Sequence, residues 1–128
     1  MAKVLVVEDD ADIRTLLDLR LRAAGHRVLG AGSAAEARAV LDERGAPDVL
    51  VSDVTLPGTT GLEMVRELRA DERFAGLPVV FLSGRVQPAD IEAGRALGAV
   101  YLTKPVVLSA LCSAIEQALV PAGTSTGW

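Results

Sequence analysis

The chain has 128 residues, half of them apolar, with a net charge of −4 and a single cysteine. This length and apolar content suit one domain with a proper core. The basic residues are scattered, which argues against direct nucleic-acid binding. One cysteine excludes an internal disulfide, and no stretch is apolar for long enough to span a bilayer or act as a signal peptide. We therefore expect a cytoplasmic protein.

Five short, valine-rich apolar runs alternate with longer helical patterns along the chain. The runs cover residues 4–7, 28–29, 49–51, 79–82 and 100–102. Most of them are continuous rather than alternating, which is typical of parallel strands covered on both faces. The second run is the weakest, and we expect it at an edge of the sheet.

A helix signal follows each of these runs. The first helix is expected to place four apolar residues on one face: Ile13, Leu16, Leu17 and Leu21. Capping boxes open the second and third helices, with Glu36 three residues after Ser33 and Glu63 three residues after Thr60. The fourth begins near Pro88, and a glycine inside it, which costs about 1 kcal/mol, makes it the least stable. The fifth is expected to turn five residues inward: Leu108, Leu111, Ile115, Ala118 and Leu119.

Five strand–helix units in strict alternation predict an α/β fold of the (βα)5 type. We expect a doubly wound, five-stranded parallel sheet in the flavodoxin-like order 2-1-3-4-5, between helices on both faces, in three α/β/α layers. Residues 1–120 are expected to form the domain, and residues 121–128 a flexible tail or the start of a linker.

Polar residues follow four of the five expected strands. Glu8 and Asp9 follow the first strand, Asp53 the third, Ser83 the fourth and Lys104 the fifth. Only glycine and alanine follow the second strand, which is the presumed edge strand. In doubly wound sheets the ligand site lies beyond the carboxyl ends of the strands. We therefore expect these five side chains to converge at one rim.

The acids of that rim require a positive charge. Two carboxylates about 4 Å apart repel by roughly 4 kcal/mol at the effective dielectric usual near a protein surface. Asp9 and Asp53, with Glu8 through a water, can hold Mg²⁺, which prefers a few carboxylates and keeps several waters. Lys104 and Ser83 suit anionic oxygens. Asp53 is thus arranged to accept a phosphoryl group as a nucleophile. The next acids, at positions 10 and 12, are interpreted as helix N-terminal residues.

Four motifs resemble those of receiver domains of bacterial two-component response regulators, of the chemotaxis-regulator type, over residues 3 to about 120. They are the pair Glu8 and Asp9, the stretch SDVTLPGTTG, which matches D-x-x-(M/L)-P-x-x-x-G from Asp53, the hydroxyl residue Ser83, and YLTKP. Each motif alone is weak, but all four, in order and at their own strand ends, are highly specific. Within them, three residues are expected to be structural: Pro57, Gly61 and Pro105.

The resemblance implies that a sensor histidine kinase or a phosphotransfer protein donates a phosphoryl group to Asp53. Asp9, Asp53 and the backbone carbonyl of Thr55 would be direct Mg²⁺ ligands, and Glu8 would act through a water. Thr55 and Arg85, two residues beyond Asp53 and the switch serine, would tune autodephosphorylation, which we expect to be slow. The protein would be a phosphoacceptor switch rather than an enzyme.

The switch itself is also implied by the resemblance. Lys104 would pair with phosphoryl oxygens, Ser83 would swing to bind another, and Tyr101 would move inward with it. The peptide before Pro105 would be cis. Output would leave through the face of the fourth helix, fifth strand and fifth helix, toward an unknown partner or a phosphorylation-dependent homodimer. The chain departs from the family in the two valines at positions 106 and 107, an apolar corner suited to a partner.

Three other functions compete with this interpretation. An aspartyl phosphatase would carry a second acid two residues after the nucleophile, where this chain has Thr55. A flavodoxin-like nucleotide binder would need a Gly/Ser/Thr-rich loop after the first strand, where this chain has acids. A receiver-like scaffold that binds partners without phosphorylation stays open, although Asp53, Ser83 and Lys104 argue against it. The sequence also leaves open whether this is a stand-alone receiver or a piece of a longer regulator or hybrid kinase.

Overall fold

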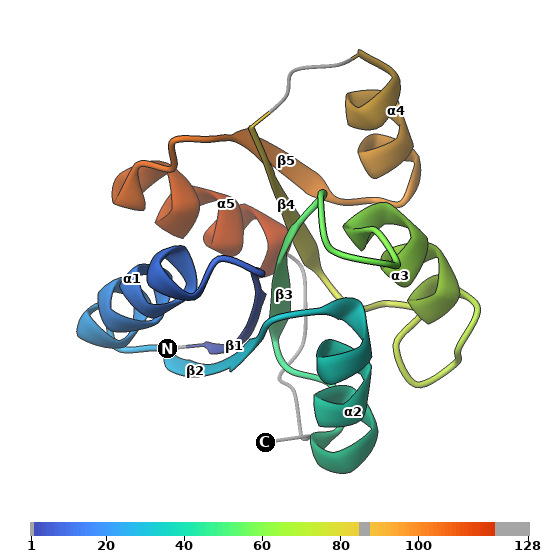
Figure 1. The fold of residues 1–128 in the computed structure, drawn as a ribbon, viewed down its shortest axis with the longest axis horizontal. Coiled ribbons are helices and arrows are strands. Elements are labelled where there is room, and N and C mark those ends of the chain that lie inside the picture. The colour runs from blue at the N-terminus through green and yellow to red at the C-terminus, as the bar shows by residue number, and fades with distance from the viewer. Residues whose placement is uncertain (1, 85–87, 120–128) are drawn as a thin grey trace.

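The computed structural model describes residues 2–84 and 88–119, and five strands alternate there with five helices (Figure 1). The strands are β1 (Lys3–Val7), β2 (Arg27–Ala31), β3 (Val49–Asp53), β4 (Val79–Ser83) and β5 (Val100–Thr103). The helices are α1 (Ala11–Ala23), α2 (Ala34–Arg44), α3 (Gly61–Arg69), α4 (Pro88–Ala96) and α5 (Leu108–Leu119). None of the helices in the described ranges has the length and apolarity needed to cross a membrane.

The five strands form one parallel sheet in the order β2-β1-β3-β4-β5, which confirms the predicted topology. β1 lies between β2 and β3, and β4 joins β3 to β5. The second strand lies at an edge, as its short apolar run indicates. Because all five strands run in the same direction, the residues that end or follow them meet along one edge of the sheet, which we call the carboxyl edge.

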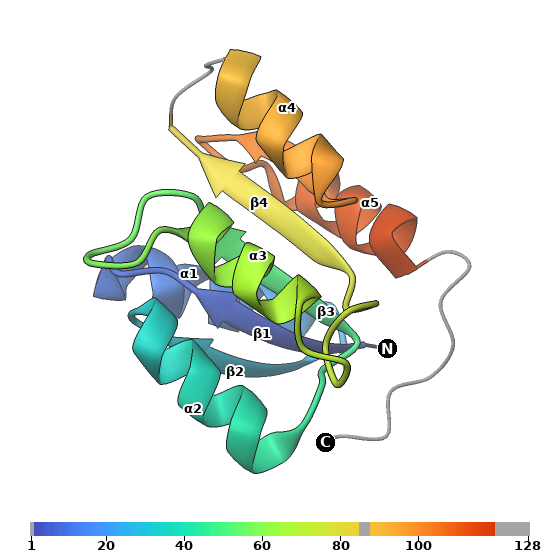
Figure 2. The same cartoon turned by 90° about the vertical axis from the view of Figure 1, so that its right-hand side faces the viewer.

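The helices cover both faces of the sheet and explain the continuous apolar runs. Figure 2 shows α2, α3 and α4 in front of the sheet, with α1 and α5 behind it. Alternate strand residues therefore enter two separate cores. In β1, Val4 and Val6 pack in the core of α1 and α5, and Leu5 and Val7 pack in the core of the other helices. Both faces of a strand are buried, so no polar alternation is needed.

The apolar face of α1 is only partly buried. Leu17 and Leu21 are buried, but Ile13 is 37% exposed and Leu16 is 50% exposed. The physical reason is an apolar cavity beside the start of the helix, which Val106 lines from the opposite side. In α5 the burial is likewise partial. Leu111 and Ile115 are buried with Ala114, whereas three of the expected residues are only half-buried: Leu108, Ala118 and Leu119.

The two predicted capping boxes differ in the structure. At the start of α3, Thr60 and Glu63 form the complete reciprocal pair. At the start of α2, the Ser33 side chain accepts from the Glu36 N–H, as expected. The Glu36 carboxylate, however, accepts from the N–H of Gly32 at 2.6 Å, one residue earlier than the capping box requires. The acidic side chain therefore fixes the turn between β2 and α2.

Arg69 holds the C-terminal end of α4 against α3. Its Nε donates to the carbonyl oxygen of Leu97 at 3.0 Å, and its Nη1 donates to that of Phe74 at 3.3 Å. The carbonyl groups at the end of a helix have no partner inside the helix. The Arg69 Nε–H supplies a partner for the carbonyl of Leu97, the residue directly after α4. α4 begins at Pro88, as predicted. This amino-terminal end lies at the other end of the sheet from the end that Arg69 holds (Figure 2).

His26 is expected to make the stability of the fold depend on pH. Its Nδ1 accepts from the Ala2 N–H at 3.0 Å. Burial lowers the pKa of His26 below its usual 6.5, the positive amino terminus adds to this, and Glu116 opposes it. The unfolded chain therefore takes up this proton first as the pH falls, and the free energy of unfolding decreases below about pH 6.5. We expect His26→Gln to weaken this decrease, compared with wild type in urea unfolding at about pH 7.5 and 5.5. Equal decreases in both proteins would contradict the assignment.

Candidate functional site

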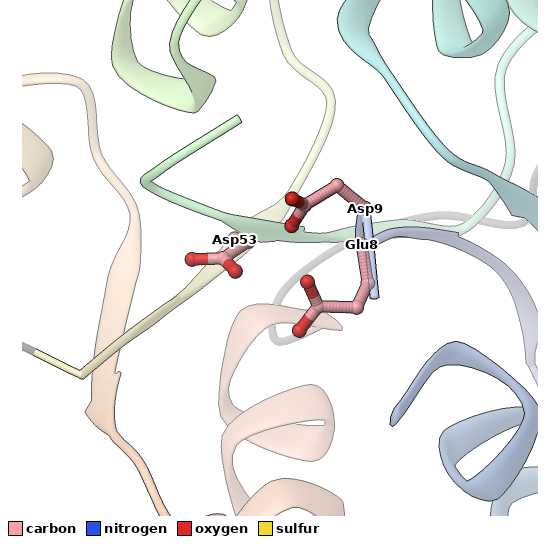
Figure 3. Close-up of side chains that lie close together, drawn as sticks. All are labelled: Glu8, Asp9 and Asp53. Atoms are coloured by element: carbon pink, nitrogen blue, oxygen red, sulfur yellow. The ribbon is translucent and has the colours of Figure 1, made fainter. Parts of the chain in front are cut away.

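The acids predicted to converge do meet at the carboxyl edge of the sheet. Figure 3 shows the carboxylates of Glu8, Asp9 and Asp53 around one small space, the first two after β1 and the third at the end of β3. One oxygen of each carboxylate lies within 4.8 Å of one oxygen of the others. Glu8 and Asp53 are only 1% and 6% exposed, whereas Asp9 is exposed. The group of acids is therefore reached from solvent on the Asp9 side.

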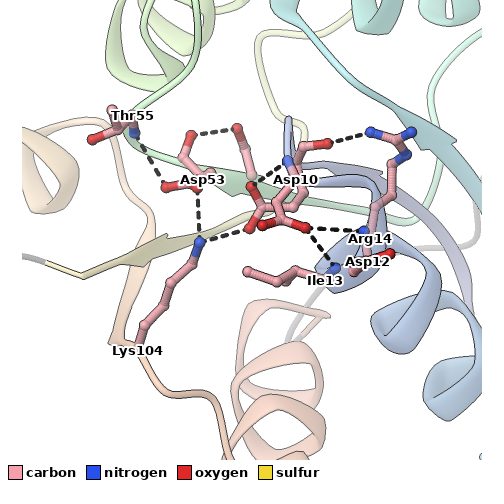
Figure 4. Close-up of polar contacts among 9 residues, drawn as sticks. Asp10, Asp12, Ile13, Arg14, Asp53, Thr55 and Lys104 are labelled. Carbon is pink, nitrogen blue, oxygen red and sulfur yellow. Dashed lines mark hydrogen bonds and ion pairs between the residues drawn. The ribbon is translucent and has the colours of Figure 1, made fainter.

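Lys104 supplies the positive charge that the acids require. Its Nζ donates to Glu8 Oε1 at 2.6 Å and to Asp53 Oδ2 at 2.8 Å (Figure 4). The ammonium group thus joins the two buried acids, and leaving either of them without a cation would be strongly destabilising. The predicted contact of Lys104 with phosphoryl oxygens stays a prediction, because its partners here are carboxylates.

The proton affinities of this group reflect burial and charge together. Burial raises the pKa of Glu8, and the neighbouring carboxylates of Asp53 and Asp9 add to the rise, whereas the Lys104 hydrogen bond opposes it. Burial disfavours the charged form of Lys104, but its bonds and attraction to Asp53 and Glu8 outweigh this, so the pKa of Lys104 is raised. Lys104 therefore stays charged at neutral pH, and Glu8 takes up a proton at higher pH than an ordinary glutamate does.

The turn between β1 and α1 separates the acids that form the site from those that start the helix. Asp10 is the N-cap of α1, and its Oδ1 accepts from the N–H groups of Asp12 and Ile13 at 2.9 and 3.1 Å. The Asp10 N–H in turn donates to Glu8 Oε2 at 3.3 Å. Asp10 and Asp12 thus lie at the helix start, as the sequence indicates.

The end of β3 fixes Asp53 through backbone contacts. Its Oδ1 accepts from the Thr55 N–H at 3.2 Å, and its carbonyl oxygen accepts from the Ser52 hydroxyl at 2.9 Å. A Cβ on Gly61 would lie 2.2 Å from that same carbonyl oxygen, so only glycine lets α3 start this close to β3. The structural role expected of Gly61 stays a prediction, which this close approach supports. The carbonyl of Thr55 as a metal ligand stays a prediction.

Ser83 lies beside this site, and Tyr101 packs against α4. Ser83 is buried at the end of β4, and its carbonyl oxygen accepts from the Lys104 N–H at 2.7 Å. The half-buried Tyr101 ring lies 6.4 Å from that of Phe81, centroid to centroid. A Cβ on Gly94 of α4 would approach the two rings to 3.2 and 3.3 Å. The helix therefore packs closely on the predicted switch aromatic, at its one internal glycine.

The remaining predicted residues have separate outcomes. The Lys104–Pro105 peptide is cis, as the resemblance implies. Pro57 is exposed in the loop between β3 and α3. Arg85 lies outside the described residues, so its expected effect on dephosphorylation stays a prediction.

Arg14 contacts this site although the motifs do not include it. Its Nη1 donates to the carbonyl oxygen of Glu8 at 2.6 Å, on the opposite side of the β1–α1 turn from Lys104 (Figure 4). The signal in the sequence is the pair of glycines around Ala31, at the one strand end without polar residues. The structure places the Arg14 side chain against both of them, Gly30 and Gly32.

An apolar surface borders the acids on the side of α1. The cavity beside Lys104 is lined by side chains of α1, of β4 and of the segment after β5: Ile13, Leu16, Leu17, Leu82, Pro105 and Val106. Val107 is 62% exposed next to it. The two valines marked in the sequence thus lie beside the exposed part of α1.

Comparison with known proteins gives the family. Residues 4–116 match the family model of the response regulator receiver domain. The chain therefore belongs to this family, whose members are the phosphoacceptor switches of two-component systems. Its fold and its arrangement of acids and lysine at the carboxyl edge agree with that assignment.

Bacterial response regulators are among its relatives. Transcriptional regulatory protein AfsQ1 of Streptomyces coelicolor is 40% identical over 107 residues, which cover 83% of this chain and 46% of that protein. Protein PilH of Pseudomonas aeruginosa is 33% identical over 93% of this chain and 98% of its own length. The structure of chemotaxis protein CheY4 of Vibrio cholerae matches with a TM-score of 0.85 and 33% identity, over 93% of this chain and 99% of that one. This chain thus spans less than half of AfsQ1 and nearly all of PilH.

Proposed function

We propose that the chain accepts a phosphoryl group on Asp53 and switches the face formed by α4, β5 and α5. The observation that supports this most directly is the environment of the Asp53 carboxylate. The Asp53 side chain is 8% exposed, with Lys104 Nζ 2.8 Å from one carboxylate oxygen and the Thr55 backbone nitrogen 3.2 Å from the other. A buried carboxylate held from both sides is oriented for attack, and a cation lies where the transferred charge would develop.

The transfer conserves atoms and charge without a side-chain base. An oxygen of Asp53 attacks the phosphorus of a phosphohistidine, the phosphorus–nitrogen bond breaks, and the imidazole leaves with the electron pair. Lys104 then exchanges a carboxylate for a phosphoryl oxygen, and the Ser83 hydroxyl donates to another. Catalysis by these residues consists of positioning and charge neutralisation.

Mg²⁺ is the cofactor that this group of residues suits. Receiver domains generally bind Mg²⁺ in an acidic pocket, and three carboxylates with oxygens within 4.8 Å are the hard ligands that the ion prefers. Asp9, Asp53 and the carbonyl of Thr55 would hold it, with Glu8 acting through a water. The bound ion supplies positive charge that offsets the charge of the phosphoryl group.

The donor proposed here is a sensor histidine kinase or a phosphotransfer protein. A donor protein must bring its phosphohistidine to Asp53 and therefore covers the surface around it. The apolar side chains beside Lys104, with Leu16 50% and Val107 62% exposed, offer a protein contact that a small phosphodonor would not need. Their exposure supports a protein donor, and the compartment proposed for this transfer is the cytoplasm.

The output is proposed to pass through Tyr101. Its ring packs against α4 at Gly94, so a movement of the ring toward Ser83 changes what supports this helix. The recipient is an output domain outside this chain, a separate protein or a second copy of the receiver. The phosphorylated state is proposed to decay slowly by autodephosphorylation, at a rate that Thr55 and Arg85 tune.

The experiment that tests this function is intact mass after incubation with acetyl phosphate, with and without Mg²⁺. We expect wild type to gain one phosphoryl group only with Mg²⁺, and Asp53→Asn to gain none. Asp12→Asn, which removes an exposed acid four residues from Glu8, is the matched control and should behave as wild type. Labelling that persists in Asp53→Asn would contradict the proposal. No labelling and no binding of Mg²⁺ with beryllofluoride would favour the scaffold that acts without phosphorylation.

A further inference from the structure

Arg14 occupies a notch made by two glycines at the end of β2. A Cβ on Gly30 would lie 3.2 Å from Arg14 Cδ, and a Cβ on Gly32 would lie 3.1 Å from Arg14 Nη1. Neither glycine has a positive φ, unlike the glycines at positions 25, 45, 58 and 98. The backbone conformation therefore does not require glycine at either position. What favours glycine there is the space that the Arg14 side chain occupies.

The notch directs the guanidinium group to one backbone oxygen. β1 ends at Val7, so the carbonyl of Glu8 lies beyond the last residue of the strand. The Glu8 N–H still donates to the carbonyl of Ala31 at 3.0 Å. Its carbonyl oxygen accepts from Arg14 Nη1 at 2.6 Å. The side chain of Arg14 thus supplies a partner at the point where the strand stops.

The carbonyl that Arg14 binds belongs to the peptide between the two acids of the first motif. Because a peptide is planar, holding its oxygen sets the direction in which the chain enters Asp9. Asp9 is exposed, so packing does little to orient it. On the other side of the turn, Glu8 is held by Lys104 and by the N–H of Asp10.

We propose that Arg14 is a positioning residue. By binding the carbonyl of the Glu8–Asp9 peptide, in the space left by Gly30 and Gly32, it orients the two acids toward the metal-binding position. Its effect on Mg²⁺ rests on the proposed function, whereas its effect on the turn does not. Residues that orient metal ligands typically change metal affinity 10–100-fold when they are removed.

The sign of the effect separates positioning from electrostatics. Removing a positive charge near a cation site should, by Coulomb attraction alone, tighten the binding of the cation. Loss of positioning should weaken it. We therefore expect Arg14→Met to bind Mg²⁺ roughly 10-fold more weakly than wild type in calorimetric titration of the whole chain with Mg²⁺ alone. Arg20→Met removes an equal charge from an exposed position on the same helix and should not weaken binding.

Two further measurements keep the test independent of folding and of the metal. Gly30→Ala keeps every charge but brings a Cβ to 3.2 Å from Arg14 Cδ, and should also weaken Mg²⁺ binding. Without metal, amide hydrogen exchange should be faster at residues 8–10 in Arg14→Met and Gly30→Ala than in wild type or Arg20→Met. Unchanged exchange at this turn, or equal or tighter Mg²⁺ binding in a folded Arg14→Met, would overturn the proposal. Failure of wild type itself to bind Mg²⁺ would count against the proposed function, and the exchange measurement would still decide the role of Arg14.

Discussion

Alanine in place of Gly61 is expected to lower the free energy of unfolding by about 3 kcal/mol, at the upper end of what overpacking usually costs. The added Cβ would lie 2.2 Å from the carbonyl oxygen of Asp53 and 3.1 Å from the hydroxyl oxygen of Ser52. The closest atom is backbone, so the contact cannot be relieved by a rotamer change. Either α3 moves away from β3 or the end of β3 is displaced. Alanine is favoured over glycine in helices by only about 1 kcal/mol, which does not offset this contact.

The measurement for Gly61→Ala is urea unfolding, with Gly76→Ala as the control. Gly76 has no atom within 4 Å of its Cβ position and no positive φ, so alanine there should change stability by less than about 0.5 kcal/mol. Because the strained atom is the carbonyl of Asp53, we also expect slower labelling of Gly61→Ala by acetyl phosphate. Equal stability of the two alanine variants would show that α3 can shift freely.

Replacing Lys104 with methionine is expected to destabilise the metal-free protein by about 3 kcal/mol at neutral pH. The variant keeps the apolar stem but leaves Glu8 and Asp53, whose side chains are 2% and 8% exposed, without their shared cation. The loss should shrink as the pH falls. Without the Lys104 hydrogen bond, which opposes the rise, the pKa of Glu8 rises further, and the folded state then takes up a proton before the unfolded chain does. A folded-state pKa above the unfolded one gives stability that increases as the pH falls.

Urea unfolding of Lys104→Met at about pH 7 and pH 5, without Mg²⁺, tests this expectation. A second comparison uses Glu8→Gln, which removes one of the two carboxylates that the lysine serves. In that background Lys104→Met should cost clearly less than in wild type, because the two residues are in direct contact. A loss that is the same at both pH values and in both backgrounds would mean that packing of the lysine stem, and not charge, is what the variant removes.

Much of the fold followed from local patterns in the sequence. Continuous valine-rich runs indicate strands buried on both faces, and strict alternation with helices then restricts the topology to few options. The acids, serine and lysine of the site could be placed for the same reason, since a residue that ends or follows a parallel strand must lie at the carboxyl edge. The weak second run was correctly assigned to an edge strand.

The features that local patterns miss depend on contacts between distant segments. The helical stripe of α1 shows that Leu16 shares a face with Leu17, but only the path of the chain after β5 leaves Leu16 half-exposed. The bond between Lys104 and Glu8 joins residues 96 positions apart, and no spacing rule predicts that the lysine contacts Glu8 as well as Asp53. Gly30 and Gly32 looked like an uninformative strand end, because their role is the space they leave for a side chain of another element.

The contact of Arg69 with the carbonyl of Leu97 holds one end of α4, so any tilt of this helix would pivot at that end. A helix of nine residues is about 13 Å long at 1.5 Å per residue. If the end held by Arg69 stays in place, a tilt of the helix by about 10° moves its amino-terminal end by about 2 Å. Tyr101 packs against α4 at Gly94, close to the held end, so a small displacement of the ring would become a larger one at the amino-terminal end of the helix. A small shift near the held end of α4 would thus become a larger shift at its other end, toward the edge of the sheet where the phosphoryl group would be received.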